Sequence, residues 1–83
     1  MSNEIRNKIL IVEDDPGICT FLRAVLASDG YDVIIVNSGG GALEMIASHC
    51  PDCILLDLGL PDAKMIFGYS DRRSYYCLLI AYY

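Results

Sequence analysis

Three carboxylates follow directly on runs of apolar residues, where a chain most easily places reactive groups. Glu13 and Asp14 follow the run at residues 8–12, and Asp57 closes the run at residues 53–57. Acids that meet at one place repel one another unless a cation is present, and an all-oxygen pocket of this kind suits Mg²⁺. Beside such a cation, Asp57 could attack a phosphoryl group and form an aspartyl phosphate. The three acids therefore predict a magnesium-assisted phosphoryl-transfer site.

The sequence around Asp57 predicts where this site lies in the fold. Residues 53–56 are apolar without polar alternation, as in a parallel-sheet strand that is covered on both faces. Gly59 and Pro61 then turn the chain off the strand. Asp57 is therefore expected at the carboxyl end of the strand, the edge at which open α/β sheets bind ligands.

Apolar runs and amphipathic segments alternate along the chain before this point. Strands are expected at residues 8–12, 33–36 and 53–57, and helices at residues 16–29 and from Ser38 to near Pro51. Asp15 can cap the first helix, with Pro16 in its first turn and Gly30 as its left-handed exit. A crossover helix between successive strands forces parallel neighbours and right-handed connections. The expected fold is α/β, with a βαβαβ unit.

Composition and charge exclude several classes of protein. The chain has 83 residues, which allow one small domain, and 54% of them are hydrophobic. No apolar run approaches the length of a membrane span, and residues 1–8 carry no signal-peptide core. The net charge of −5 argues against nucleic acid as a direct partner, because phosphate backbones require clustered Lys and Arg. A cytoplasmic protein without a membrane or nucleic-acid partner is expected.

The charge and the tyrosines are unevenly distributed. Residues 1–62 hold three basic and ten acidic residues, whereas residues 63–83 hold three basic residues and one acidic residue. Five of the six Tyr also lie in the last segment. These shifts predict a boundary close to Asp62.

Two segments resemble the receiver domain of two-component response regulators. KILIVEDDP at residues 8–16 is similar to the first strand of that family with its acidic pair, and LLDLGLPD at residues 55–62 is similar to the phosphoacceptor strand and loop. The resemblance implies the flavodoxin-like receiver fold with strand order 2-1-3, and Asp57 as phosphoacceptor. It also implies Mg²⁺ held by Glu13, Asp14, Asp57 and the backbone carbonyl of Gly59. The resemblance further implies a sensor histidine kinase as the partner. Within the family, the LGLPD motif is most similar to the subfamily whose members carry a winged-helix DNA-binding domain.

Residues 63–83 depart from the family pattern. Family members continue with Asp-Gly and later with strands that end in Ser or Thr and in Lys-Pro, and none of these is recognisable after Asp62. Lys64 stands too early to be the family's phosphate-binding lysine. Residues 1–62 are therefore interpreted as the N-terminal half of a receiver domain, a partial doubly wound sheet of three strands and two helices. Residues 63–83 are interpreted as an atypical C-terminal tail, the replaced or out-of-frame end of a truncated domain.

A sheet cut short in this way would leave the strand at residues 53–57 as an exposed edge. An apolar edge of this kind is a template for self-association. Residues 75–81 could add there as a fourth strand or could form a short helix over the sheet, and the sequence leaves both open. Marginal stability and a tendency to aggregate are expected.

Two other functions compete with phosphoacceptance. A Mg²⁺-dependent phosphatase or transferase would also use an aspartate nucleophile, but Gly59 stands where the relevant hydrolases have an acid/base Asp. The other alternative is a fragment that keeps the pattern without activity. A phosphoacceptor module rather than a turnover enzyme is expected.

Three further features are interpreted as structural. Cys50 and Cys53 form a C-x-x-C, but a redox motif opens a helix after a strand, and here a helix precedes a strand. The glycines at residues 39–41 lack the Gly-Lys-Ser/Thr of a phosphate loop and indicate a loose helix start. His49 is expected near a helix end, without the surroundings of a phosphodonor.

Overall fold

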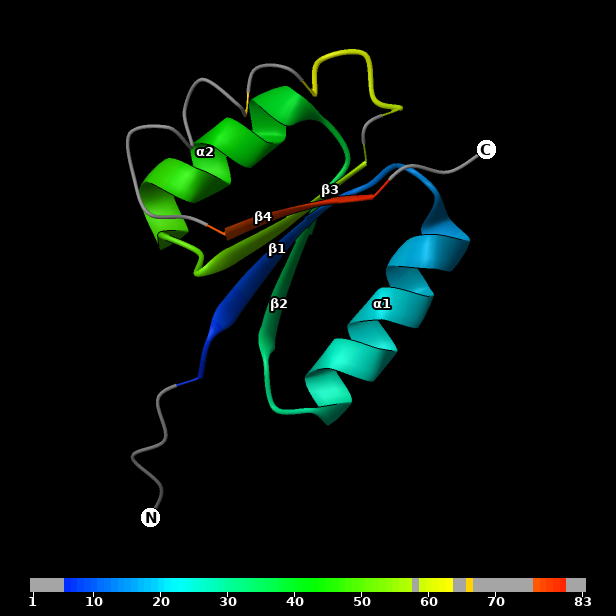
Figure 1. The fold of residues 1–83 in the computed structure, drawn as a ribbon, viewed down its shortest axis with the longest axis vertical. Coiled ribbons are helices and arrows are strands. Elements are labelled where there is room, and N and C mark those ends of the chain that lie inside the picture. Colours follow the sequence, from blue (N-terminus) through cyan, green and yellow to red (C-terminus); the bar gives the residue numbers. More distant parts are fainter. Residues whose placement is uncertain (1–5, 58, 64–65, 67–75, 81–83) are drawn as a thin grey trace.

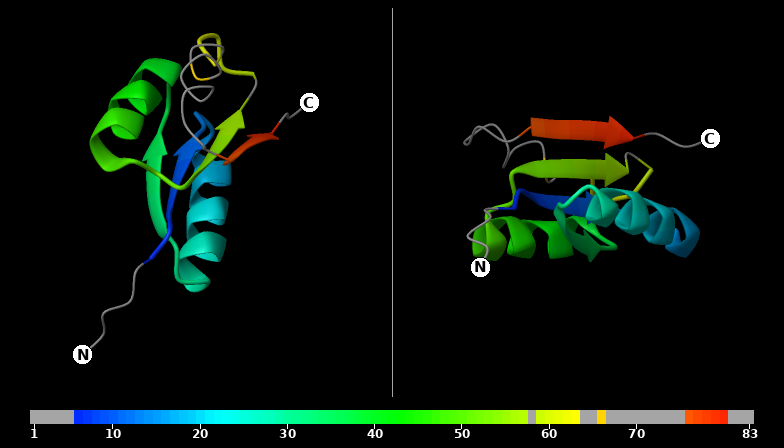
Figure 2. Two further views of the ribbon diagram at one scale, coloured as in Figure 1. Left: turned by 60° about the vertical axis from the view of Figure 1, so that its left-hand side comes forward. Right: turned by 90° about the horizontal axis from the view of Figure 1, so that it is seen from below.

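In the part of the chain that the structure describes, a four-stranded parallel sheet carries helices on both faces (Figure 1). The computed structural model describes residues 6–57, 59–63 and 66, and the backbone of residues 76–80. Within these residues the elements are β1 (Lys8–Val12), α1 (Pro16–Ser28), β2 (Asp32–Val36), α2 (Gly39–His49), β3 (Cys53–Asp57) and β4 (Tyr76–Ile80). The sheet order is β2-β1-β3-β4, and all three pairings are parallel (Figure 2). The predicted α/β class, parallel sheet and crossover helices are confirmed.

Side chains alternate between the two faces of the sheet, because successive residues of a strand point to opposite sides. One buried cluster packs against α2 and includes Leu10, Val12, Ile54, Leu56, Ala42 and Ile46. The other packs against α1 and is formed by Ile9, Ile11 and Leu55, with Leu22 and Leu26 of the helix half-buried against it. The apolar runs without polar alternation therefore belong to strands that are covered on both faces.

The ends of both helices follow local sequence signals. The Asp15 carboxylate accepts hydrogen bonds from the backbone N–H groups of Gly17 and Ile18, at 2.8 and 3.1 Å. Gly30 has a φ of +91°, which is the left-handed exit expected after α1. Ser38 caps α2 through the N–H of Gly41, and Cys50 ends α2 with a φ of +47°.

The prediction that β3 is an exposed edge is wrong. β4 pairs with β3 along its whole length, from Cys53 opposite Tyr76 to Asp57 opposite Ile80. The backbone N–H and C=O groups on that side of β3 are therefore used within the chain. Of the two conformations that the sequence left open for this segment, the strand is the one observed. Self-association through a sheet edge and the boundary near residue 62 stay predictions.

Among the residues that the structure describes, neither α1 nor α2 has the length and hydropathy needed to cross a bilayer.

Candidate functional site

Glu13, Asp14 and Asp57 meet at the carboxyl edge of the sheet. β1 and β3 are adjacent and parallel with Val12 opposite Leu56, so the next residues along the two strands, Glu13 and Asp57, lie side by side. Each of the three acids offers a carboxylate oxygen, and these oxygens all lie within 4.8 Å of one another. The structure thus brings together the three acids that the sequence placed at this edge.

The two innermost acids are removed from solvent and held by backbone amides. Glu13 is 4% exposed and Asp57 is 9% exposed, whereas Asp14 is exposed. One oxygen of Glu13, Oε2, accepts hydrogen bonds from the N–H groups of Asp14 and Asp15, at 3.0 and 3.1 Å. Asp57 Oδ1 accepts a hydrogen bond of 2.8 Å from the N–H of Gly59. Both carboxylates are therefore oriented before any ligand arrives.

Burial raises the pKa of the Glu13 carboxyl, and the neighbouring Asp57 charge raises it further. The backbone N–H groups of Asp15 and Asp14 act in the opposite direction, because they stabilise the ionised form. The net effect is upward, so the ionised pair is electrostatically unfavourable. A cation placed among these oxygens would reverse that balance.

The donor set fits Mg²⁺. This ion prefers oxygen ligands, is held by one or two carboxylates and keeps several waters. Glu13, Asp14 and Asp57 supply the carboxylates, and the exposed side of the cluster at Asp14 leaves room for water. Gly59 is exposed and lies two residues after Asp57. The hydrogen bond between the two residues is made by the backbone N–H of Gly59.

An open depression of about 410 Å³ adjoins the acids. It is lined by residues from the ends of several elements, namely Glu13, Asp14, Cys19, Ile35, Val36, Asn37 and Gly41. The thiol of Cys19 donates a 3.5 Å hydrogen bond to the backbone carbonyl of Glu13. Burial raises the pKa of the Cys19 thiol, and the Glu13 charge adds to the effect. A raised pKa disfavours the thiolate, which is the nucleophilic form of cysteine.

The structure shows one interaction beside the site that the sequence analysis missed. Asp62, in the loop after β3, accepts hydrogen bonds from the N–H groups of Gly39 and Gly40 at the start of α2, at 2.8 and 3.1 Å. These two bonds lower the pKa of the Asp62 carboxyl. The signal available in the sequence was an acid in a loop and glycines at a helix start, both at the carboxyl edge of one sheet.

The glycine run at residues 39–41 forms the start of α2, as predicted, and one of its members is also required by packing. Gly39 is buried, and a Cβ at this position would overlap the backbone carbonyl oxygen of Asp62. Glycine is thus required at residue 39 by a close approach of two backbones. A Cβ on Gly40 would meet no atom within 4 Å, so the requirement is specific to one member of the run.

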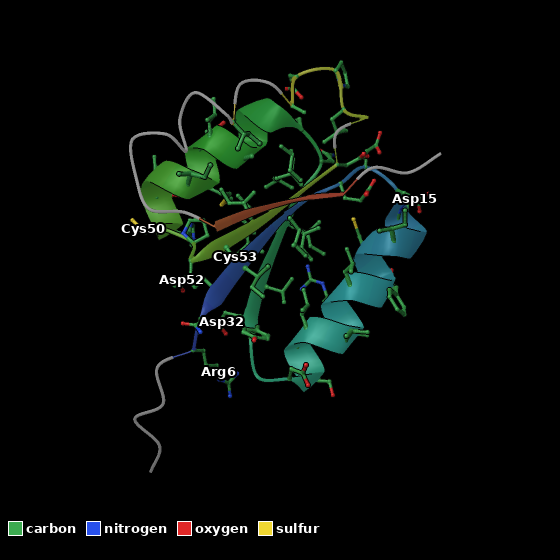
Figure 3. The ribbon with its side chains drawn as sticks, viewed as in Figure 1. Arg6, Asp15, Asp32, Cys50, Asp52 and Cys53 are labelled. Atoms are coloured by element: carbon green, nitrogen blue, oxygen red, sulfur yellow. The ribbon has the colours of Figure 1, made fainter. Side chains whose placement is uncertain are left out.

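The two cysteines of the C-x-x-C lie away from the acids. Figure 3 shows Cys50, Asp52 and Cys53 at the opposite end of the sheet from Asp15. Cys53 is half-buried and packs with the cluster that faces α1, and burial raises the pKa of its thiol. Cys53 is thus a packing residue, as predicted. Cys77 lies in β4, where the structure describes only the backbone.

Sequence comparisons connect this geometry to a family. The response regulator receiver domain family model matches residues 9–69. The chain is similar to the transcriptional regulatory protein KdpE of Mycobacterium tuberculosis, with 48% identity over 58 residues that cover 70% of this chain and 26% of KdpE. It is also similar to the DNA-binding response regulator MtrA of Mycolicibacterium smegmatis, with 40% identity over 57 residues that cover 69% of this chain and 25% of MtrA. The chain therefore spans about a quarter of the length of these relatives.

Solved structures show the same architecture. The BeF3-activated N-terminal receiver domain of Klebsiella pneumoniae RstA is similar with a TM-score of 0.82 and 35% identity, over 90% of this chain and 67% of that one. A CheY-like receiver domain from Methylobacillus flagellatus has a TM-score of 0.83 at 21% identity, over 95% of this chain and 72% of that one, which shows a shared fold. The match to the family model over residues 9–69 covers most of the sequence, and the chain belongs to the response regulator receiver domain family.

Proposed function

We propose that the chain is a phosphoacceptor module of a two-component phosphorelay, in which Asp57 receives a phosphoryl group from a sensor histidine kinase. Response regulator receiver domains work with such kinases, and family membership supports this partner. The observation that carries the proposal is the meeting of three carboxylate oxygens within 4.8 Å at the carboxyl edge of the sheet. One of the three, Asp57, is nearly buried and is oriented by a backbone amide.

The proposed transfer forms an acyl phosphate. With Oδ1 held by Gly59, the second oxygen of Asp57 attacks the phosphorus of a phosphohistidine. A new P–O bond forms, the P–N bond breaks, and the leaving imidazole takes a proton from solvent. Glu13, Asp14, Asp57 and the carbonyl of Gly59 would hold Mg²⁺, which neutralises charge on the phosphoryl oxygens when it is bound.

The chain's own residues contribute in three ways. The amides of Asp14 and Asp15 keep the Glu13 carboxylate in place, and the amide of Gly59 does the same for Asp57. Burial of Glu13 and Asp57 limits the access of water and so protects an acyl phosphate from hydrolysis. Repulsion between the two acids in the metal-free chain favours binding of a cation.

Mass spectrometry of the intact chain tests the proposal. The protein is incubated with Mg²⁺ and acetyl phosphate, and parallel samples contain a chelator or carry Asp57→Asn. A gain of one phosphoryl group that needs Mg²⁺, is absent from Asp57→Asn and is removed by neutral hydroxylamine supports the proposal. Steady release of phosphate without an adduct would support a phosphatase instead. A folded protein that shows neither result contradicts phosphoacceptance.

A further inference from the structure

The loop after β3 is attached to the rest of the molecule at two points. At its first point, the N–H of Gly59 donates to Asp57 Oδ1 at 2.8 Å, and the N–H of Leu60 donates to the Asp57 backbone carbonyl at 3.2 Å. At its second point, Asp62 accepts the two amide hydrogen bonds from Gly39 and Gly40. The loop thus joins the acceptor residue to the beginning of α2.

Close packing reinforces the second attachment. Gly39 is buried, and the space that its Cβ would fill is taken by the backbone and side chain of Asp62. Leu60 and Ala63, on either side of this contact, are 6% and 4% exposed and belong to the core that faces α2. The position of the loop is therefore set by a backbone contact, by apolar burial and by one carboxylate.

The Asp62 carboxylate is outside the acidic cluster. The cluster contains Glu13, Asp14 and Asp57, and both oxygens of Asp62 are already engaged by amides of α2. Besides the through-space effect of its charge, Asp62 can therefore affect an ion among these acids through the loop that carries Gly59. Groups that orient the ligands of a metal in this way commonly change its affinity when they are removed.

We propose that Asp62 is a positioning residue for the Mg²⁺ and phosphoacceptor site. By docking the loop on the start of α2, Asp62 keeps Gly59 at the distance from Asp57 at which its amide orients the acceptor carboxylate. This inference rests on the proposed function, because it assigns Asp62 a role at the same site.

Mg²⁺ affinity separates this role from a purely structural one. We expect Asp62→Ala to weaken Mg²⁺ binding about 10-fold in calorimetry of the full chain at neutral pH. Asp62→Asn keeps one carbonyl oxygen as acceptor. The Mg²⁺ affinity of this variant should therefore be intermediate between those of Asp62→Ala and the unmodified protein. The amide resonance of Gly59 should move in both variants, since its position relative to Asp57 changes.

Asp52→Ala is the matched control. The Asp52 carboxylate also accepts a backbone N–H, that of Lys8 at 2.8 Å, but it lies at the opposite end of β3. Asp52→Ala should lower the melting temperature and leave Mg²⁺ affinity and the Gly59 resonance unchanged. If Asp62→Ala does not fold, the comparison of Asp62→Asn with Asp52→Asn replaces it.

The outcomes distinguish the two proposals. If the unmodified chain binds Mg²⁺ and both Asp62 variants bind it equally well, the positioning role is overturned and the proposed function stands. If the folded unmodified chain binds no Mg²⁺, the metal site itself fails and the inference fails with it. A loss of affinity in Asp62→Ala that Asp52→Ala reproduces would also overturn the positioning role, because it would show a general loss of stability.

Discussion

Glu13 and Asp57 extend two adjacent parallel strands and face each other as a nearly buried pair of acids. Their carboxylates are close enough to serve one ion, and without an ion the charge of Asp57 makes ionisation of Glu13 less favourable. We therefore expect the pair to link the stability of the chain to pH and to divalent cations.

Glu13→Gln should stabilise the metal-free chain at neutral pH while it weakens Mg²⁺ binding. The amide oxygen of Gln can still accept from the backbone N–H groups of Asp14 and Asp15, and the repulsion with Asp57 is removed. We expect a gain of about 1 kcal/mol in the free energy of unfolding, measured with urea. Asp14→Asn at the exposed acid is the control and should change stability less. A Glu13→Gln variant that unfolds more easily than the unmodified protein would contradict this account.

The stabilising effect of Mg²⁺ should depend on pH. Folding raises the pKa of Glu13, so its favourable contribution is fully present below the ordinary value of 4.5 and is lost as pH rises through the raised value. Mg²⁺ restores stability in the range where Glu13 is ionised, because it binds the folded chain and competes with protons. The Mg²⁺-induced rise in melting temperature should thus be largest at neutral pH and small near 4.5. A rise that does not change with pH would show that the ion binds elsewhere.

Asp62 should show the opposite dependence on pH. Folding lowers the pKa of this carboxyl through the bonds from Gly39 and Gly40, so its contribution is present above the ordinary value of 3.8 and is lost as pH falls through the lowered value. The amide resonances of Gly39 and Gly40 should therefore shift together on acidification, with a midpoint below 3.8. Asp62→Asn should abolish the shift.

Asp15 should matter for the helix and not for the metal. Its carboxylate caps α1, so Asp15→Ala should lower the free energy of unfolding by about 1 kcal/mol. Asp15→Asn can still accept these bonds and should remain close to the unmodified protein. Mg²⁺ affinity should change little in either variant, and a large loss in Asp15→Ala would place Asp15 in the metal site.

Gly39 and Gly40 provide a matched pair for the contact between the loop and α2. Gly39→Ala places a methyl group against the Asp62 backbone and should cost about 1–3 kcal/mol in urea unfolding. Gly40→Ala meets no atom within 4 Å, and alanine favours the helix, so it should stabilise by about 0.5 kcal/mol. Equal effects of the two substitutions would argue against the close approach at Gly39.

The elements and their ends could be predicted because their causes are local. The first helix was expected at residues 16–29, and α1 covers Pro16–Ser28 with Asp15 as its cap. The third strand was expected at residues 53–57, and β3 covers Cys53–Asp57. Apolar runs, a capping acid and a glycine exit act within a few residues of the position that they determine.

Relations between distant residues are what only the tertiary structure decided. The sequence alone shows two strands that end in acids. The parallel pairing of these strands brings Glu13 to Asp57. The sequence did not decide that β4 would pair with β3, or that Asp62 would dock on Gly39. Tyr76 is 23 positions from Cys53, and Asp62 is also 23 positions from Gly39. Contacts across such separations depend on which sheet edge is open and how closely two backbones can approach, and these conditions exist only after the sheet has assembled.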